Sequence, residues 1–237
     1  PDYKKLKELF MQWQLGMQAG GGWNALFWCN HDQPRIVSRM GDEGDYWKES
    51  AKMLAGMIHL MRGTPYIYQG EEIGMLNAHY SSIGQYRDVE SLNYYQILLG
   101  KGRTEEEALR ILAARSRDNG RTPMQWNSGT YGGFSEAEPW LSLSGAFREE
   151  ITAEFQKEDP DSILSFYKML ISLAYERELG SDKIAVFCNL GKEEQTVLIG
   201  KEWIDGKLLL ENYRERQKAP ESEVFVMKPY ELTVLEK

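Results

Sequence analysis

The chain has 237 residues, of which 42% are hydrophobic and 12% aromatic, enough for one large domain or two modest domains with a well-filled core. Its formal net charge of -8 argues against a nucleic acid or an anionic membrane as a partner, because neither polyanion is attracted to an acidic protein. No apolar run approaches the ~20 residues of a membrane span and no signal peptide is recognisable, so the sequence predicts a cytoplasmic protein.

The first 70 residues alternate between helical and strand patterns. Apolar residues at helical spacing predict an amphipathic helix over residues 2–19, which three glycines end. The run "NALFWCN" (24–30) predicts a strand buried on both faces. A helix capped by Asp45 is expected over residues 45–63, and "TPYIYQG" (64–70) predicts a second buried strand. This order is typical of parallel βα units, and because two parallel strands cannot form a covered sheet alone, we expect further strands upstream.

The middle of the chain is less regular. A helix is predicted over residues 89–99, and the capping box of Thr104 and Glu107 predicts the start of another. Residues 115–134 are rich in Gly, Pro, Asn and Arg without periodicity, which indicates a structured loop. Asp159-Pro160 is expected to open a last helix.

From Lys183 onwards the pattern becomes all β. Short apolar runs separated by turn residues predict a small antiparallel sheet or sandwich, with strands within residues 183–190, 194–200, 207–213, 222–228 and 230–236. The sequence therefore predicts an α/β part followed by a separate all-β part. Both cysteines, Cys29 and Cys188, lie in apolar runs, which favours buried thiols and a reducing compartment.

A polar cluster, Asn30-His31-Asp32-Gln33, directly follows the first predicted strand. Functional side chains of parallel βα proteins lie at the carboxyl ends of strands. Taken singly, His31 is often only a structural hydrogen-bonding residue, and Asp32 a helix cap or turn former. Together with Arg35, and directly after an apolar strand, they favour a functional site.

Other features of the sequence indicate which kind of ligand that site binds. The segment "GTPYIYQGEEIG" (63–74) lacks the Lys-Ser/Thr of a phosphate-binding loop, so a nucleotide is not expected. The chain has 3 histidines, and His59 falls within a predicted helix, so neither a metal site nor a cofactor is predicted. A carboxylate beside a histidine and several amides suits the hydroxyls of a sugar. Nearby aromatic residues could flank a pyranose, although core packing is their commoner role: Trp23, Phe27 and Trp28.

Three segments carry a resemblance to a known family. "FWCNHDQPRIVSR" (27–39) resembles the fourth sequence signature of the α-amylase family of glycoside hydrolases. "GTPYIYQGEEIGM" (63–75) and "RSRDNGRTPMQW" (115–126) are similar to segments of its α-glucosidase branch, and the resemblance extends over essentially the whole chain. Within that branch, residues 20–35 and 86–95 look most like the enzymes that hydrolyse trehalose 6-phosphate to glucose and glucose 6-phosphate. The oligo-1,6-glucosidases, which act on isomaltose-type oligosaccharides, are the nearest competitors.

The resemblance implies a (β/α)8 barrel followed by a β-sandwich domain. Residues 1–172 are then expected to be the last quarter of the barrel with its last helices, and residues 173–237 a shortened sandwich domain. The resemblance assigns Asp32 as the carboxylate that stabilises the transition state. It also implies that His31 donates to a hydroxyl of the bound sugar and that Arg35 binds substrate at the leaving-group side.

Retaining hydrolysis also needs a nucleophile and a general acid ~5 Å apart. In the family both stand on earlier strands, and no match to either motif occurs here, so we expect an upstream region and no activity of the chain alone. Glu71 and Glu72 are expected instead to be structural and to pair with Arg117 or Arg121. Asp118 is a further candidate partner for those arginines.

Two departures leave alternatives open. After the last predicted helix the sequence passes directly to "AYERELGSDKIAVF" (174–187), where relatives continue into a basic segment and a first strand pair. No residue of the chain is identified as a phosphate ligand, although Arg35 is a candidate, and no oxygen-rich loop predicts calcium binding. An alternative of another class is a catalytically inactive fragment or a carbohydrate-interaction module.

Overall fold

The computed structural model describes residues 2–175, 183–213 and 220–237. The chain forms two compact units, each described separately below. One unit comprises residues 1–27, 44–66 and 166–237, and the other comprises residues 28–43 and 67–165. The predicted domain boundary between residues 172 and 173 stays a prediction.

The first unit begins with α1 (Tyr3–Ala19), which confirms the predicted N-terminal helix. The Asp2 side chain caps it by accepting a hydrogen bond from the Lys5 N–H at 3.0 Å. No residue of α1 is buried, and its exposed apolar side chains include Leu9 and Trp13.

Two short parallel strands follow in this unit. β1 (Ala25–Leu26) pairs with β2 (Thr64–Pro65) in parallel register, as the alternation of patterns predicted. The prediction that both strands are buried on both faces is wrong. Ala25 and Thr64 are exposed, because within the described ranges this sheet has two strands, too small a sheet to be covered on both faces as a larger parallel sheet is.

The helix expected between those strands is α3 (Trp47–His59), which ends before the expected residue 63 and buries Trp47, Ala51, Leu54 and Ile58. The prediction that Asp45 caps it is wrong. The N-cap residue is Tyr46, no side chain caps the helix, and backbone carbonyls at its start accept the first N–H groups. α3 contacts β2 and two strands of the C-terminal region, β3 (Ile184–Cys188) and β7 (Leu232–Glu236).

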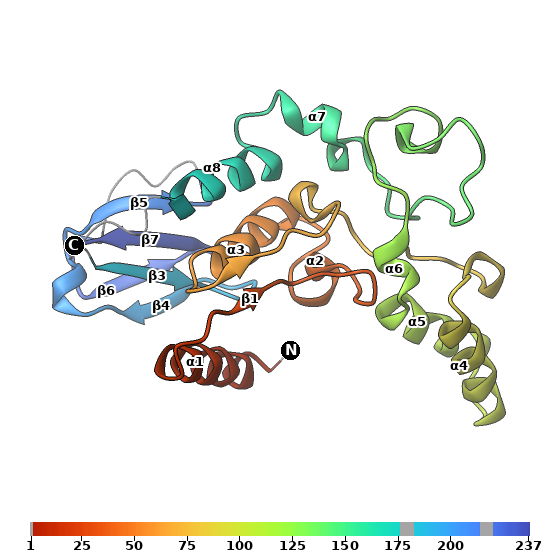
Figure 1. Cartoon of the computed structure of the whole chain (residues 1–237), viewed down its shortest axis with the longest axis horizontal. Coiled ribbons are helices and arrows are strands. Elements are labelled where there is room, and N and C mark those ends of the chain that lie inside the picture. The colour runs from red at the N-terminus through yellow and green to blue at the C-terminus, as the bar shows by residue number, and fades with distance from the viewer. Residues whose placement is uncertain (1, 176–182, 214–219) are drawn as a thin grey trace. The chain divides into compact units, whose positions relative to one another are not determined.

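The C-terminal part of this unit contains all five predicted strands, arranged in two antiparallel sheets (Figure 1). β7 is central in the first sheet, between β3 and β5 (Lys207–Glu211). β4 (Gln195–Leu198) and β6 (Val224–Met227) form the second, and η5 (Lys201–Trp203) follows β4. Much of the sequence departure predicted after the last helix lies in residues 176–182, outside the described residues.

The second unit is a set of helices and turns around an aromatic core. α4 (Val89–Gly100) confirms the predicted helix over residues 89–99, and α5 (Glu105–Arg115) packs against it. The predicted capping box of α5 is present, because the Thr104 and Glu107 side chains each accept the other's backbone N–H at 3.1 Å. The core beneath these helices includes Tyr80, Tyr86, Tyr95, Leu98, Leu112 and Leu141.

Several short elements complete this unit: α2 (Ile36–Met40), η1 (Glu71–Ile73), η2 (Ile83–Gln85), α6 (Asp118–Arg121), η3 (Thr130–Gly133), η4 (Glu149–Ile151) and α7 (Ala153–Lys157). The segment predicted as a loop thus contains α6 and η3. The last predicted helix is α8 (Ile163–Tyr175), which begins three residues after Pro160 and continues into the first unit. No helix of the described ranges has the length and apolar character needed to cross a membrane.

Both cysteines are free thiols, as predicted. Cys29 is buried, as predicted, and its Sγ accepts a hydrogen bond from the Ile36 N–H at 3.2 Å. The prediction of a buried thiol is wrong for Cys188, which is half-buried because it lies in β3 at the side of its sheet. Burial raises the pKa of each thiol to about 12, so neither is a ready nucleophile at neutral pH.

Candidate functional site

The predicted polar cluster lies in a tight turn between β1 and α2. Asn30 Oδ1 accepts a hydrogen bond from the Asp32 N–H at 2.8 Å, and the Asn30 carbonyl accepts one from the Gln33 N–H at 3.2 Å. Such bonds are typical of an Asx turn. Asn30 therefore fixes the backbone of the turn and leaves the side chains of His31 and Asp32 to face outwards.

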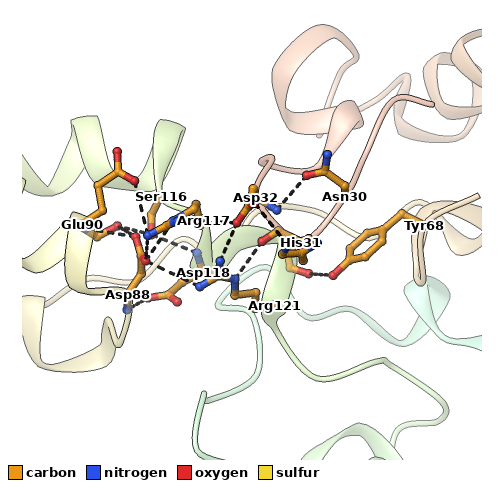
Figure 2. Close-up of polar contacts among 12 residues, drawn as sticks. Asn30, His31, Asp32, Tyr68, Asp88, Glu90, Ser116, Arg117, Asp118 and Arg121 are labelled. Carbon is orange, nitrogen blue, oxygen red and sulfur yellow. Dashed lines mark hydrogen bonds and ion pairs between the residues drawn. The ribbon is translucent and has the colours of Figure 1, made fainter. Parts of the chain in front are cut away.

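His31 and Asp32 are both accessible. The His31 side chain is 70% exposed and that of Asp32 is 46% exposed, with His31 Nε2 lying 3.3 Å from Asp32 Oδ2 (Figure 2). The structure thus brings together the two side chains that the sequence placed at the strand end.

Two arginines from the segment around α6 approach the same carboxylate (Figure 2). Arg121 Nη2 donates to Asp32 Oδ1 at 2.8 Å, and Arg121 Nε donates to the His31 carbonyl at 2.8 Å. Arg117 Nη1 lies 3.7 Å from Asp32 Oδ1. One carboxylate oxygen of Asp32 therefore faces two guanidinium groups, and the other faces His31.

The arginines are held in turn by Asp88, whose side chain is 3% exposed. Arg117 donates to Asp88 Oδ1 from Nη2 at 2.6 Å and from Nε at 3.0 Å, and Arg121 Nη1 lies 3.6 Å from the same oxygen. Burial by itself raises the pKa of Asp88, but hydrogen bonds from Arg117 and Ser91 outweigh it and lower the pKa. Charges thus alternate from Asp32 through the arginines to Asp88.

Glu71 and Glu72 do not pair with Arg117 or Arg121, so that expectation is wrong. The two arginines contact the carboxylates of Asp32, Asp88 and, from Arg117 at 3.5 Å, Glu90. Glu71 is buried in η1, and burial raises the pKa of Glu72.

Asp118 is not an arginine partner either. Its side chain is fully buried, and Oδ2 accepts the backbone N–H groups of Arg87 and Asp88 at 2.8 and 2.9 Å. Asp118 Oδ1 has no hydrogen-bond partner among the described residues. Asp118 therefore fixes the backbone that carries Asp88 at the start of α4.

Arg35 lies beneath the cluster and is 1% exposed. Its Nε donates to the Asn119 carbonyl at 3.1 Å and its Nη1 donates to the Gln69 carbonyl. The guanidinium also lies 5.5 Å from the centroid of the Tyr68 ring. Arg35 therefore joins the three segments that carry the family resemblance (27–39, 63–75 and 115–126), called the signature segments below. Its predicted contact with substrate stays a prediction.

A groove lies beside these charges, with a cavity volume of about 860 Å³. Its lining residues come from the turn, α4, α5 and the start of the α6 segment: Asp32, Asp88, Glu90, Ser91, Tyr94, Ile111, Leu112, Arg115, Ser116 and Arg117. Such a volume is ample for a disaccharide, and the mixture of carboxylates, guanidinium groups, hydroxyls and one aromatic ring suits sugar hydroxyls.

Sequence reasoning did not place Asp88 at the site and gave Arg117 and Arg121 the wrong partners. The available signal was the arginine-rich segment 115–126, which contains both residues. The Asp32 turn lies 89 positions from Arg121, too far for local spacing to reveal the pair.

Comparisons with known proteins agree with the resemblance carried by the three segments. The family description "Alpha amylase, catalytic domain" matches residues 1–181. A trehalose-6-phosphate hydrolase of Bacillus subtilis (strain 168) is 55% identical over 73% of this chain and 30% of its own length. An oligo-1,6-glucosidase of Bacillus cereus is 39% identical over 97% of this chain and 45% of its own length.

A crystal structure of Bacillus licheniformis trehalose-6-phosphate hydrolase is similar in fold as well as sequence. It superposes with a TM-score of 0.93 at 44% identity, over 99% of this chain and 47% of that protein. The chain spans less than half the length of each of these relatives.

Proposed function

Because this chain belongs to the alpha-amylase family, whose catalytic domain matches residues 1–181, we propose that it supplies part of an enzyme that hydrolyses trehalose 6-phosphate. The reaction adds water across the glycosidic bond and releases glucose and glucose 6-phosphate. The observation that carries this proposal is the half-exposed Asp32 carboxylate, which lines a groove of about 860 Å³. The similarity to trehalose-6-phosphate hydrolases supplies the substrate.

In this proposal Asp32 stabilises the transition state. An oxocarbenium-like sugar ring develops positive charge, and a fixed carboxylate beside it stabilises that charge more strongly than it stabilises the neutral substrate. His31 donates a hydrogen bond to a hydroxyl of the same ring, which its exposed imidazole supports. The buried guanidinium of Arg35 supports a role in holding the signature segments together.

The nucleophile and the general acid are proposed to lie outside these 237 residues. Retaining hydrolysis needs two carboxyl groups about 5 Å apart on opposite sides of the scissile bond. The coverage of 47% of a related hydrolase supports a second part that carries them. Residues 1–172 would then form the last quarter of a (β/α)8 barrel and residues 173–237 its sandwich domain, and the chain alone would not hydrolyse sugars.

Hydrolysis of α-1,6-linked oligosaccharides is the second candidate. It is favoured by the oligo-1,6-glucosidase that matches 97% of this chain. Assays of the protein encoded by the complete gene with trehalose 6-phosphate and with isomaltose distinguish the two. Turnover of neither substrate, with sugar binding retained, would instead support a carbohydrate-interaction module.

The role of Asp32 is tested by Asp32→Asn in the protein encoded by the complete gene. Loss of one electrostatic contact to the transition state typically lowers kcat by on the order of 100- to 1000-fold, and we expect a loss of that size at an unchanged melting temperature. Asp205→Asn is the matched control. It replaces an exposed aspartate at φ 56°, a backbone conformation that asparagine also tolerates, and should leave kcat within about twofold of wild type. A folded Asp32→Asn variant with near-normal kcat would refute the assignment.

A further inference from the structure

Arg121 contacts the segment that carries Asp32 at two points. Nη2 binds the Asp32 carboxylate and Nε binds the neighbouring His31 carbonyl, each at 2.8 Å (Figure 2). A guanidinium that uses two separate donors fixes both the direction and the distance of its partners, which an ammonium cannot do. We propose that Arg121 is a positioning residue that orients the Asp32 carboxylate for the reaction, an inference that rests on the proposed function.

The element that carries Arg121 is packed too closely on the turn to shift freely. A Cβ added at Gly120 would lie 2.8 Å from the Gln33 carbonyl oxygen and 3.0 Å from that of Asn30. The Gly120 carbonyl also accepts the Tyr68 hydroxyl at 2.9 Å. α6 is therefore fixed against the turn by its backbone, independently of the arginine side chain.

The guanidinium of Arg121 is itself restrained. Its side chain is 25% exposed, and Nη1 lies 3.6 Å from the buried Asp88 carboxylate. Asp88 is held by Asp118 through its backbone N–H and by Ser91 through its side chain. Arg121 is therefore held between two carboxylates, and rotation away from Asp32 would break both contacts.

The two carboxylate oxygens of Asp32 have different contacts. Oδ1 receives Arg121 and lies near Arg117, whereas Oδ2 faces the exposed imidazole of His31. An arginine that anchors one oxygen leaves the other to face the sugar ring in a fixed direction. Without Arg121, the remaining cation lies 3.7 Å from Oδ1, so the carboxylate would gain rotational freedom.

The test uses Arg121→Ala and Arg121→Lys in the protein encoded by the complete gene, with steady-state kinetics on trehalose 6-phosphate. Misorientation of a catalytic group typically costs on the order of 100-fold, and we expect that loss in kcat for Arg121→Ala with a KM change of less than about threefold. Lysine keeps the charge but cannot make both contacts, so Arg121→Lys should lose kcat by an intermediate factor. Guanidinium ion added at millimolar concentration should restore part of the kcat of Arg121→Ala, and sodium chloride at the same ionic strength should not.

Arg103→Ala is the matched control. Arg103 is an exposed arginine outside the turn, and its Nη1 lies 3.4 Å from Glu107 Oε1. The kcat of this variant should equal that of wild type. In the Asp32→Asn background, Arg121→Ala should cost nothing further, because the group that it orients is already lost.

Three results would each overturn the inference. The first is a kcat of Arg121→Ala within about threefold of wild type, and the second is a loss of kcat that guanidinium does not rescue in a variant whose melting temperature is lowered. The third is full additivity of the effects of Arg121→Ala and Asp32→Asn on kcat. If Arg121→Ala does not fold, a wild-type kcat for Arg121→Lys overturns the inference equally. Each of these results leaves the proposed function standing when Asp32→Asn alone is inactive. A folded Asp32→Asn variant with near-normal kcat refutes the assigned role of Asp32, whereas a wild-type protein that does not turn over trehalose 6-phosphate refutes the proposed function itself.

Discussion

At the scale of single residues, an ion pair outside the groove makes stability depend on pH. His79 Nε2 lies 2.9 Å from Glu43 Oε2, with the two side chains 40% and 35% exposed. The hydrogen bond to Glu43 raises the pKa of His79. Burial by itself raises the pKa of Glu43, but hydrogen bonds from His79 and Ser38 outweigh it and lower the pKa. Because both side chains are partly exposed, the pair stabilises the fold by at most about 1 kcal/mol.

The two shifts define the pH range in which this pair stabilises the protein. Because its pKa is raised, His79 stabilises the folded state fully at pH values below about 6.5, the ordinary pKa of histidine. This stabilisation is lost as the pH rises through the folded-state pKa. The lowered pKa of Glu43 contributes stability above about 4.5, which is lost as the pH falls through its folded-state pKa. We expect His79→Gln to lower the melting temperature more at pH 5.5 than at pH 8.5, and Glu43→Gln to show the same pattern. Equal losses at both pH values would contradict the assignment.

Single residues of the site were predictable only where the signal was local. His31 and Asp32 stood out because they directly follow an apolar run. The partners of Arg117 and Arg121 were not predictable, because charge pairing follows tertiary placement and several carboxylates were equally available along the sequence. The buried position of Asp88 likewise depends on α4 and α5 packing together.

At the scale of elements, predictions succeeded where the residues that start a helix are local in the sequence. The capping box placed the start of α5 correctly, because its two side chains bond to backbone groups three residues away. α6 was missed, because four residues have no periodicity. Its conformation depends on Asn119, whose side chain accepts the Ala78 N–H at 2.9 Å and donates to the Ala113 carbonyl at 3.0 Å.

The close approach of α6 to the turn predicts the effect of Gly120→Ala. The added Cβ would meet two backbone carbonyl oxygens, which cannot move aside as a flexible side chain can. Overpacking of this kind costs typically 1–3 kcal/mol, so we expect a lower free energy of unfolding in urea and a reduced kcat, because the turn that carries Asp32 must shift. Gly100→Ala, at the end of α4 with no atom within 4 Å of the added Cβ, is the control and should not destabilise. Wild-type stability of Gly120→Ala would contradict the prediction, because it would show that the turn can accommodate a Cβ at this position.

At the scale of the whole molecule, the sequence separated an α/β part from a β part, yet one compact unit contains pieces of both. α3 packs against the central strand β7 of the first C-terminal sheet. The Asn212 side chain donates to the Glu49 carbonyl of α3 at 2.9 Å. These contacts could not be predicted, because hydrophobic periodicity identifies a buried face but not the surface that covers it.

The tightest of these contacts gives a test of whether the C-terminal strands and α3 fold as one cooperative unit. A Cβ at Gly56 would overlap Leu232 Cδ2 and lie 3.3 Å from its Cγ, and Leu232 is fully buried. Alanine gains about 0.5–1 kcal/mol over glycine within a helix, but overpacking costs about 1–3 kcal/mol, so Gly56→Ala should lower the free energy of unfolding on balance. Leu232→Ala should cost about 2–5 kcal/mol by leaving a cavity.

The double variant distinguishes a shared core from two independent ones. The alanine methyl at position 56 would occupy part of the space that Leu232 vacates, so the combined loss of unfolding free energy should be smaller than the sum of the single losses by about 0.5–3 kcal/mol. Urea unfolding followed by tryptophan fluorescence and by far-ultraviolet circular dichroism should give one coincident transition for all four proteins. Strict additivity would mean that the contact between positions 56 and 232 does not couple the helix to the strands, because a side-chain overlap that couples them must appear in the double-mutant cycle as a nonzero interaction energy.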